Sequence, residues 1–575
     1  MDTLKRTWTY FKKYKKAIIF CYILIIASVS LKMVIPLVSG SIIDNVYRGN
    51  RGELLIPLLL VIVFTPVLRH GINYARSYLM EIKTIRVVIS LRQMLLKKFF
   101  ELSFDTYNKS KTGEVMTTMT SDAENIKNIY ADILPNMFES VLSFIIASVV
   151  MFTENPLMTL CCYIVIPFVY LSMRTYSREL FPKFWDIRKR VAGITSVCQE
   201  NINGVRIVRA FAREDFEKEK LERENRSFFN YQMDLAYAWT RMHMKMFPLG
   251  KLPQIIILLV GSILIVYNQL TVGTLVAFTG LISSLMDPID VLPMYVSQIQ
   301  NATVSCEKVF TFLEQDPLIK NCEHPYYPEK WSGDIEFRGV RLAYDDHVVL
   351  DDINLKIPFG YKVGVIGSTG SGKTSLINLI PRFYDCSGGE VLIGGVNVNE
   401  YDINALREHV SFVMQDVFLF SNTVDSNIAY RDADVPEDDV VQSAKYACAD
   451  DFVMKMPEGY ETIVGERGIG LSGGQKQRIS MARSFLNDIP ILVLDDSTSA
   501  LDNETEQEIL GNIRSMGGRR TLFIIASRMS SVVDADMIVH LHDGRIIETG
   551  THDELMAQNG RYAQIFKEQY FSEEL

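Results

Sequence analysis

Paired cysteines are missing from this sequence of 575 residues. Its eight cysteines are scattered, and only Cys161 and Cys162, in an apolar run, are neighbours. None shows the spacing of a zinc site or of a disulfide framework. The composition therefore predicts buried or cytosolic free thiols and argues against a metal-bound or disulfide-stapled fold.

A cleavage site is also missing near the start of the chain. The segment "MDTLKRTWTYFKKYKK" is basic, but a long apolar stretch follows it without a small-residue cleavage motif. We interpret it as an interfacial helix that leads into a first membrane span, rather than as a signal peptide.

Acidic residues are scarce in the first part of the chain. Residues 1–332 hold 38 Lys and Arg against 29 Asp and Glu, whereas the rest hold 21 against 39. A chain of this length needs two or more domains. Because the basic half also carries the long apolar segments, it predicts a membrane setting and no nucleic-acid partner.

Six apolar segments meet or approach the roughly 20 residues that a spanning helix needs. They predict an all-α, six-helix transmembrane domain over residues 1–315, followed by a linker over 316–332 that is rich in proline. The six segments lie near residues 17–39, 54–80, 133–153, 157–176, 247–268 and 272–299.

The long connections at 81–132 and 177–246 are rich in Lys and Arg. The positive-inside rule places them, and the N-terminus, in the cytoplasm. Their helical patterns predict extensions below the bilayer that turn near 113–125 and 210–216. We expect these two tips to dock on another domain.

The stretch "VGVIGSTGSGKTSL" reads as a strand, a glycine-rich loop and the start of a helix, and opens an α/β domain over 333–575. Its glycines let backbone N–H groups face phosphate oxygens at a helix N-terminus. Lys373 reaches the β- and γ-phosphates of ATP, and the Thr374 hydroxyl binds Mg²⁺. The predicted ATP-binding residues of this loop are Gly367, Ser368, Thr369, Gly370, Ser371, Gly372, Lys373, Thr374 and Ser375.

Two adjacent aspartates end the apolar run "ILVLDD". We expect its strand to lie in a parallel sheet beside the strand that ends at Ile366, so that Asp495 faces the same Mg²⁺ ion. An aspartate at a strand end often only caps a turn, but its pairing with the phosphate loop favours the metal role.

A second anion cradle lies between these motifs, in "GIGLSGGQKQRISMAR". One nucleotide does not need two cradles in one domain, but a phosphate held between two domains does. The residues of this second cradle are Leu471, Ser472, Gly473, Gly474 and Gln475.

Over nearly its whole length the chain resembles the ATP-binding cassette (ABC) transporter family. "GSTGSGKTS" is similar to the Walker A loop, "LSGGQ" to the signature motif and "ILVLDD" to the Walker B strand. Gln415 matches the Q-loop, whose side chain joins the Mg²⁺ ligands, and Asp502 matches the D-loop. "VGERG" matches the X-loop of exporters, and Tyr344 the aromatic residue that stacks on adenine. The fused order of domains resembles exporters.

The resemblance implies that two cassettes pair head to tail. Each ATP then lies between the Walker motifs of one cassette and the signature of the other. Such a chain is an ATP hydrolase coupled to transport. We expect it in a plasma membrane of the bacterial type, with the cassette in the cytoplasm.

Two positions depart from the family pattern. Asp496 stands where the family has the glutamate that orients the attacking water, and Ser527 stands where it has a histidine. The shorter carboxylate misplaces the base, and a misplacement of about 1 Å can cost ~10²-fold in rate. We therefore predict a degenerate site in a heterodimer whose partner chain carries glutamate and histidine.

Two alternatives stay open at this point: a homodimer that hydrolyses ATP slowly, and an ATP-gated channel or sensor subunit that binds ATP without pumping. Ionisable residues at membrane depth usually face a cavity or pair with each other. Arg69, Glu139 and Asp287 are the candidates for a substrate cavity. The sequence does not separate drugs, lipids and peptides as substrates.

Overall fold

The computed structural model describes residues 2–109, 112–465, 468–487, 489–516, 519–526 and 528–573. The chain divides into two compact units. The helical unit comprises Met1–Phe100 and Thr112–Gln315, and the α/β unit comprises Glu101–Lys111 and Asp316–Leu575. The predicted fold class, a helical membrane domain followed by an α/β domain, is confirmed.

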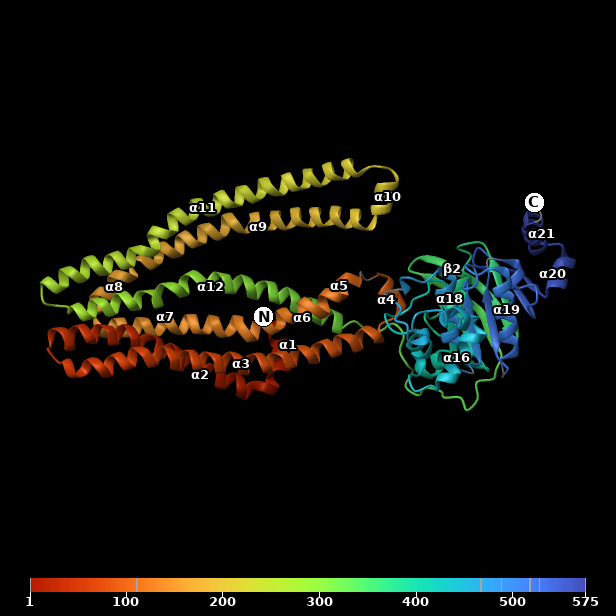
Figure 1. The fold of residues 1–575 in the computed structure, drawn as a ribbon, viewed down its shortest axis with the longest axis horizontal. Helices are drawn as coiled ribbons and strands as arrows, with labels where there is room; N and C mark the ends of the chain where they lie inside the picture. Colours follow the sequence, from red (N-terminus) through yellow and green to blue (C-terminus); the bar gives the residue numbers. More distant parts are fainter. Residues whose placement is uncertain are drawn as a thin grey trace. The chain divides into compact units, whose positions relative to one another are not determined.

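Six long or apolar helices dominate the helical unit (Figure 1). They are α2 (Lys15–Ser41), α3 (Leu55–Glu101), α7 (Leu134–Glu154), α9 (Val165–Asn203), α11 (Glu214–Val266) and α12 (Val272–Leu313). Shorter elements connect them: α1 (Asp2–Phe11), η1 (Lys12–Tyr14), η2 (Ile42–Arg48), η3 (Gly52–Leu54), α5 (Thr112–Thr117), η4 (Thr118–Asp122), α6 (Ala123–Asn128), η5 (Ile129–Ile133), α8 (Pro156–Tyr163) and α10 (Val205–Ala210).

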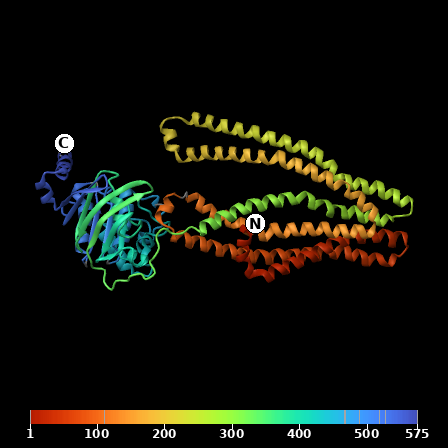
Figure 2. The same cartoon turned by 180° about the vertical axis from the view of Figure 1, so that it is seen from behind.

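Helices α2, α7 and α12 share an apolar core that includes Ile25, Met151 and Phe278. Helices α9 and α11 run side by side and are joined at one end by α10, as both views show (Figures 1 and 2). Polar caps fix where two apolar helices begin. The Asn155 side chain accepts from Met158 N ahead of Pro156, and the Thr271 hydroxyl accepts from Thr274 N.

Among the described residues, five helices are long and apolar enough to cross a membrane. The fourth predicted segment, 157–176, overlaps the shorter apolar helix Pro156–Val169. The five long helices are Lys5–Arg48, Gly52–Glu101, Gly113–Glu154, Glu214–Val266 and Val272–Leu313.

Two sheets build the α/β unit. The four-stranded sheet has the order β2-β1-β4-β5, and the six-stranded sheet has the order β10-β9-β3-β8-β7-β6. The strands are β1 (Ile335–Tyr344), β2 (His347–Ile357), β3 (Lys362–Gly367), β4 (Gly388–Ile393), β5 (Val396–Asn397), β6 (Val410–Val413), β7 (Ile491–Asp495), β8 (Thr521–Ile525), β9 (Met537–His542) and β10 (Arg545–Gly550).

One strand pairing differs from the expectation. Strands β3 and β7 do lie in one parallel sheet, but β8 pairs with both and separates them. The prediction that they are neighbours was therefore wrong. Alternate residues of β7 enter different apolar clusters, Leu492 one and Val493 the other. Both faces of the sheet are thus covered, as is typical of parallel strands.

Helices pack against these strands, and two of them begin at the predicted phosphate cradles: α13 (Lys373–Asn378) and α18 (Gly473–Phe485). The other helical elements of this unit are α4 (Phe104–Lys109), α14 (Ile403–Glu408), α15 (Val424–Ile428), η6 (Ala429–Arg431), α16 (Glu437–Tyr446), α17 (Asp450–Val453), η7 (Gly459–Glu461), α19 (Asn503–Ser515), η9 (Met529–Ser531), α20 (His552–Gln558) and α21 (Arg561–Glu573).

The segment before the first predicted tip belongs to the α/β unit, whereas the predicted tip belongs to the helical unit. Residues 113–125 lie in α5, η4 and α6, and the short helix α4 is part of the α/β unit. The Phe104 ring lies 4.6 Å from the Phe383 ring between centroids. The buried Ser103 starts this turn, because its carbonyl accepts from Thr106 N. The second tip is a turn after α10, where Phe211 is exposed.

Candidate functional site

The loop between β3 and α13 has the backbone that a phosphate cradle needs. Gly370 has φ +84° and Gly372 has φ +99°, in the left-handed region that favours glycine. A Cβ at Gly367 collides with the Leu541 carbonyl oxygen. Lys373 Nζ donates to the carbonyl oxygens of Gly367, at 2.8 Å, and Ser368, at 2.9 Å. Lys373 therefore folds back over the loop, at the place where phosphate oxygens approach.

Two oxygen groups meet at the mouth of this loop. Asp495 ends β7 and is buried, and Thr374 Oγ1 donates to its Oδ1 at 3.2 Å. Burial raises the pKa of the Asp495 carboxyl. The Ser371 hydroxyl oxygen is also buried and has no hydrogen-bond partner among the described residues. A hydroxyl, a carboxylate and an unpaired buried oxygen fit Mg²⁺, which prefers oxygen ligands.

Asp496 lies next to these groups in a constrained backbone position. Its φ is +46°, and its N–H donates to the Ile525 carbonyl oxygen at 3.0 Å. Gln415 Nε2 donates to Asp496 Oδ2 at 3.5 Å. The structure thus brings the predicted Q-loop residue to the acid that follows Asp495. Ser527 lies outside the described residues, as do Glu466 and Arg467 of the predicted X-loop.

Burial lowers the pKa of Lys373, and the negative charges of Asp496 and Asp495 oppose that shift. The three charges therefore share one electrostatic environment. A polyphosphate that binds here lies beside one cation, Lys373, and beside two carboxylates. The carboxylates repel the phosphate unless a metal ion lies between them.

The predicted signature begins α18 with a reciprocal cap. Ser472 Oγ accepts from Gln475 N at 3.3 Å, and Ser472 N donates to Gln475 Oε1 at 2.9 Å. Leu471 packs against the apolar core, whereas Ser472 and Gly473 are exposed. An exposed helix N-terminus of this kind presents N–H groups to an anion that arrives from outside the unit.

Asp502 has a local role as well. It caps α19, where its carboxylate accepts from Thr505 N at 2.8 Å and from Thr505 Oγ1 at 3.1 Å. The hydrogen bonds from Thr505 lower the pKa of Asp502. This cap fixes the conformation of the chain where α19 begins, and so the position of the Asp502 carboxylate.

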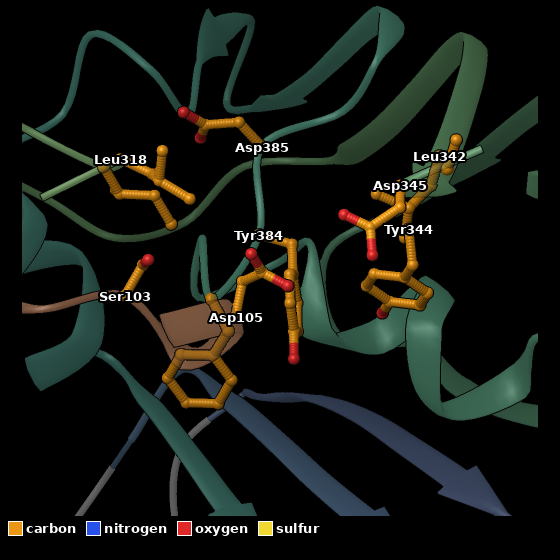
Figure 3. A pocket seen from close by; sticks show the side chains of 11 residues that line it. Ser103, Asp105, Leu318, Leu342, Tyr344, Asp345, Tyr384 and Asp385 are labelled. Carbon is orange, nitrogen blue, oxygen red and sulfur yellow. The ribbon is translucent and has the colours of Figure 1, made fainter. Parts of the chain in front are cut away.

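Tyr344 ends β1 beside the phosphate loop. Its hydroxyl donates to Ser375 Oγ at 3.3 Å, and its ring meets the Tyr384 ring edge to face at 5.0 Å. Burial raises the pKa of Tyr344. Both tyrosines line a cavity of about 200 Å³ (Figure 3). The aromatic residue predicted to stack on adenine is thus hydrogen-bonded through its hydroxyl to α13, the helix that also carries Thr374.

Sequence analysis missed three of the residues that line this cavity: Ser103, Asp105 and Tyr384 (Figure 3). Tyr384 follows the helix that starts at Lys373, in "PRFYD", and an aromatic residue there was a readable signal. Asp105 belongs to α4, far away in sequence, and no local pattern joins it to Tyr344.

The three predicted cavity residues, Arg69, Glu139 and Asp287, each lie in an ion pair. Arg69 Nη2 lies 3.7 Å from Glu139 Oε1, and Arg76 Nη1 lies 3.3 Å from Glu139 Oε2. Lys32 Nζ lies 4.0 Å from Asp287 Oδ2. The structure therefore brings Arg69 and Glu139 together and gives Asp287 a different partner.

Comparisons with known proteins agree with this architecture. Residues 18–289 match the family described as ABC transporter transmembrane region, and residues 350–499 match the family described as ABC transporter. The chain is 34% identical over 572 residues to an uncharacterized ABC transporter ATP-binding protein of Bacillus subtilis, YknU, covering 99% of this chain and 98% of that protein.

It is also 33% identical to YgaD of Bacillus subtilis, provisionally named a multidrug export ATP-binding/permease protein, over 98% of this chain and 99% of that protein. A solved bacterial Atm1-family ABC exporter with ATP bound has a TM-score of 0.81 at 24% identity, covering 96% of this chain and 98% of that one. At that identity the likeness shows the fold.

Proposed function

Because this chain belongs to the ABC transporter family, as an exporter with its membrane and ATPase domains fused, we propose that it is one half of a heterodimeric exporter and owns the weaker of two ATP sites. The observation that carries the proposal is Asp496. Its carboxylate follows Asp495 at the end of β7, and its backbone is held by the hydrogen bond to Ile525. A side chain one methylene shorter than glutamate cannot reach the same point from that anchored backbone.

The residues that bind nucleotide are nevertheless present. The amides of the loop and Lys373 bind the phosphates, Tyr344 stacks on adenine, and Thr374, Asp495 and Gln415 hold Mg²⁺. When bound, Mg²⁺ neutralises charge on the phosphate oxygens. Closing the two cassettes over ATP needs these contacts but no general base, so this site keeps ATP while the partner's site turns over.

The signature of this chain completes the partner's site. Ser472 and Gly473 are exposed at the start of α18, and Gly474 is half-buried. We assign them to the γ-phosphate of the ATP that the partner's Walker residues bind. The partner therefore carries the glutamate and the histidine that this chain lacks.

For orientation, we place the N-terminus and the cassette in the cytoplasm of a bacterial-type plasma membrane, on the positive-inside argument. The domain boundaries near residues 315 and 332 are part of the same proposal. The name of YgaD, which refers to multidrug export, favours drugs as cargo over peptides.

Steady-state ATPase of the purified two-chain complex tests the assignment. Asp496→Asn should lower turnover only modestly, because little hydrolysis occurs at this site. Ser472→Ala should lower it much more, by about 10²-fold if one phosphate donor of a competent site is lost. Abolished turnover in Asp496→Asn beside near-normal turnover in Ser472→Ala contradicts the proposal. So does a chain that forms an active symmetric dimer alone.

A further inference from the structure

A polar face of α3 and an apolar pocket are continuous in the helical unit. Arg69, Asn73, Arg76 and Met80 follow one another at spacings of four, three and four residues, so they lie on one face of the helix. Arg69 and Arg76 flank Glu139, and Met80 lines the pocket. One helix face therefore passes from charged to apolar within three turns.

The polar part is not balanced in charge. Both arginines share the single carboxylate of Glu139, and Arg69 Nε also donates to Ser28 Oγ at 3.4 Å. The group of Arg69, Arg76 and Glu139 thus carries one net positive charge. Between the two arginines, Asn73 Oδ1 is buried and has no hydrogen-bond partner among the described residues. A buried acceptor without a donor costs free energy of folding. A hydrogen-bond donor of a ligand can satisfy this oxygen.

This charge lies within the membrane-spanning part of the helix. At 1.5 Å per residue, Arg69 is about 21 Å along α3 from Leu55, inside a hydrocarbon core of about 30 Å. Arg76 lies near the end of that core. Charges at such depth are rare and usually mark a ligand path.

The apolar part is a pocket of about 480 Å³. It is lined by Lys5, Trp8, Ile18, Tyr22, Met80, Tyr130 and Leu134. The Cys21 thiol, next to Tyr22, lies 3.8 Å from the Arg76 carbonyl oxygen, which brings the pocket wall against the arginine turn. Six of these seven lining residues are aromatic or otherwise largely apolar, as suits an acyl chain or a flat hydrophobic body, and Lys5 is the one cation among them.

We propose that this continuous face, Arg69–Asn73–Arg76 with the adjoining pocket, binds a single-chain amphiphile whose head carries one negative charge and one hydrogen-bond donor. The negative group contacts the arginines, the donor contacts Asn73 Oδ1, and the tail fills the pocket beside Trp8. The inference deepens the proposed transport function and rests on it for its purpose. Binding itself requires no ATP.

The probe is lysophosphatidylglycerol with a brominated tail, and lysophosphatidylcholine with the same tail is its zwitterionic control. Quenching of Trp8 fluorescence reports binding to the nucleotide-free complex in phosphatidylcholine nanodiscs. We expect tighter binding of the anionic probe, and no quenching from the pocket in Trp8→Phe. Equal binding of the two probes overturns the proposal.

Two variants with opposite expected effects on probe affinity distinguish a binding role from ion pairs that only hold the helices together. Arg76→Gln removes the excess charge and should weaken the anionic probe about tenfold or more. Glu139→Gln removes the competing carboxylate and should strengthen it. The exposed Arg86 on the same helix supplies the matched control, and Arg86→Gln should change nothing. If Arg76→Gln and Glu139→Gln shift affinity in the same direction, the pair is only structural.

Asn73→Ala tests the donor contact separately. It should weaken lysophosphatidylglycerol, whose head has hydroxyl groups, and leave dodecyl sulfate, whose head has none, unchanged. Equal loss for both probes contradicts the assigned role of Asn73. Because these measurements use no nucleotide, their failure leaves the two-site proposal standing, and failure of the ATPase test leaves the binding result standing.

Discussion

The side-chain amide of Gln415 donates to the carboxylate of Asp496 across 3.5 Å. Gln415 follows β6 and Asp496 follows β7, and these strands are neighbours in the parallel sheet. The predicted Q-loop residue is thus in contact with the acid that we propose stands in place of the catalytic base. A change in the reach of that acid should change both hydrolysis and the position of Gln415.

Placing the family's residues at the two positions that differ should therefore restore hydrolysis at this site. In a complex whose partner site is disabled by Ser472→Ala, the double change Asp496→Glu with Ser527→His should raise residual turnover about 10²-fold, since it re-places the base and adds a γ-phosphate contact. Steady-state ATPase measures the gain. Asp496→Asn in the same background is the control, and equal rates in all three complexes would show that the base position is not what limits this site.

Tyr344 should contribute to ATP affinity through its ring. Tyr344→Ala should weaken ATP binding to this chain about tenfold, whereas Tyr344→Trp keeps the π face and should preserve it. Tyr344→Phe removes only the hydroxyl contact with Ser375 and is the matched control. Photolabelling with an azido-ATP, resolved by chain, measures occupancy of this site alone. Unchanged labelling of Tyr344→Ala would make the residue part of the core only.

The local motifs were readable from the sequence because their chemistry is local. The glycine spacing predicted the strand, loop and helix around Lys373, and "LSGGQ" predicted an anion cradle, which the structure places at the start of α18. The order of strands was not readable in the same way. That β8 lies between β3 and β7 depends on pairing across more than a hundred residues, which a strand's own pattern does not encode.

The turn before α5 shows a second limit. A turn was predicted near residues 113–125, but the structure places Gly113 inside α5, with no atoms near the position of a Cβ. A glycine in a helix costs only about 1 kcal/mol relative to alanine, so a longer helical run can absorb it. The contact between Arg76 and Glu139 was also out of reach, because it joins two different helices.

The buried Asp495 carboxylate should make the nucleotide-free protein less stable while it serves Mg²⁺ binding. Burial raises the pKa of this carboxyl, so the folded state favours its neutral form. The stability that the bound proton adds is complete below the ordinary pKa of aspartate and is lost as the pH rises through the raised pKa. Asp495→Asn should therefore raise the unfolding free energy of the nucleotide-free protein at neutral pH, by about 0.5–2 kcal/mol.

The same variant should need far more Mg²⁺ to bind ATP, because a charged ligand is lost. Calorimetric unfolding without nucleotide, and ATP binding titrated against Mg²⁺, measure the two effects. Thr374→Ser keeps the hydroxyl and serves as the control. A less stable Asp495→Asn protein with unchanged Mg²⁺ dependence contradicts both the burial argument and the metal role.

Phe104 should carry the signal between nucleotide binding and the membrane helices. Its ring packs on Phe383, and the neighbouring Ser103 and Asp105 line the cavity that holds Tyr344. Phe104→Ala removes this packing, so ligand stimulation of ATPase should fall several-fold while basal turnover stays near normal. Phe100→Ala deletes an exposed ring one turn earlier in the chain and should change neither rate. Transport into vesicles, measured beside ATPase, shows whether the two have separated. If Phe104→Ala keeps full stimulation, α4 is a passive contact, and coupling must run through the turn at Phe211.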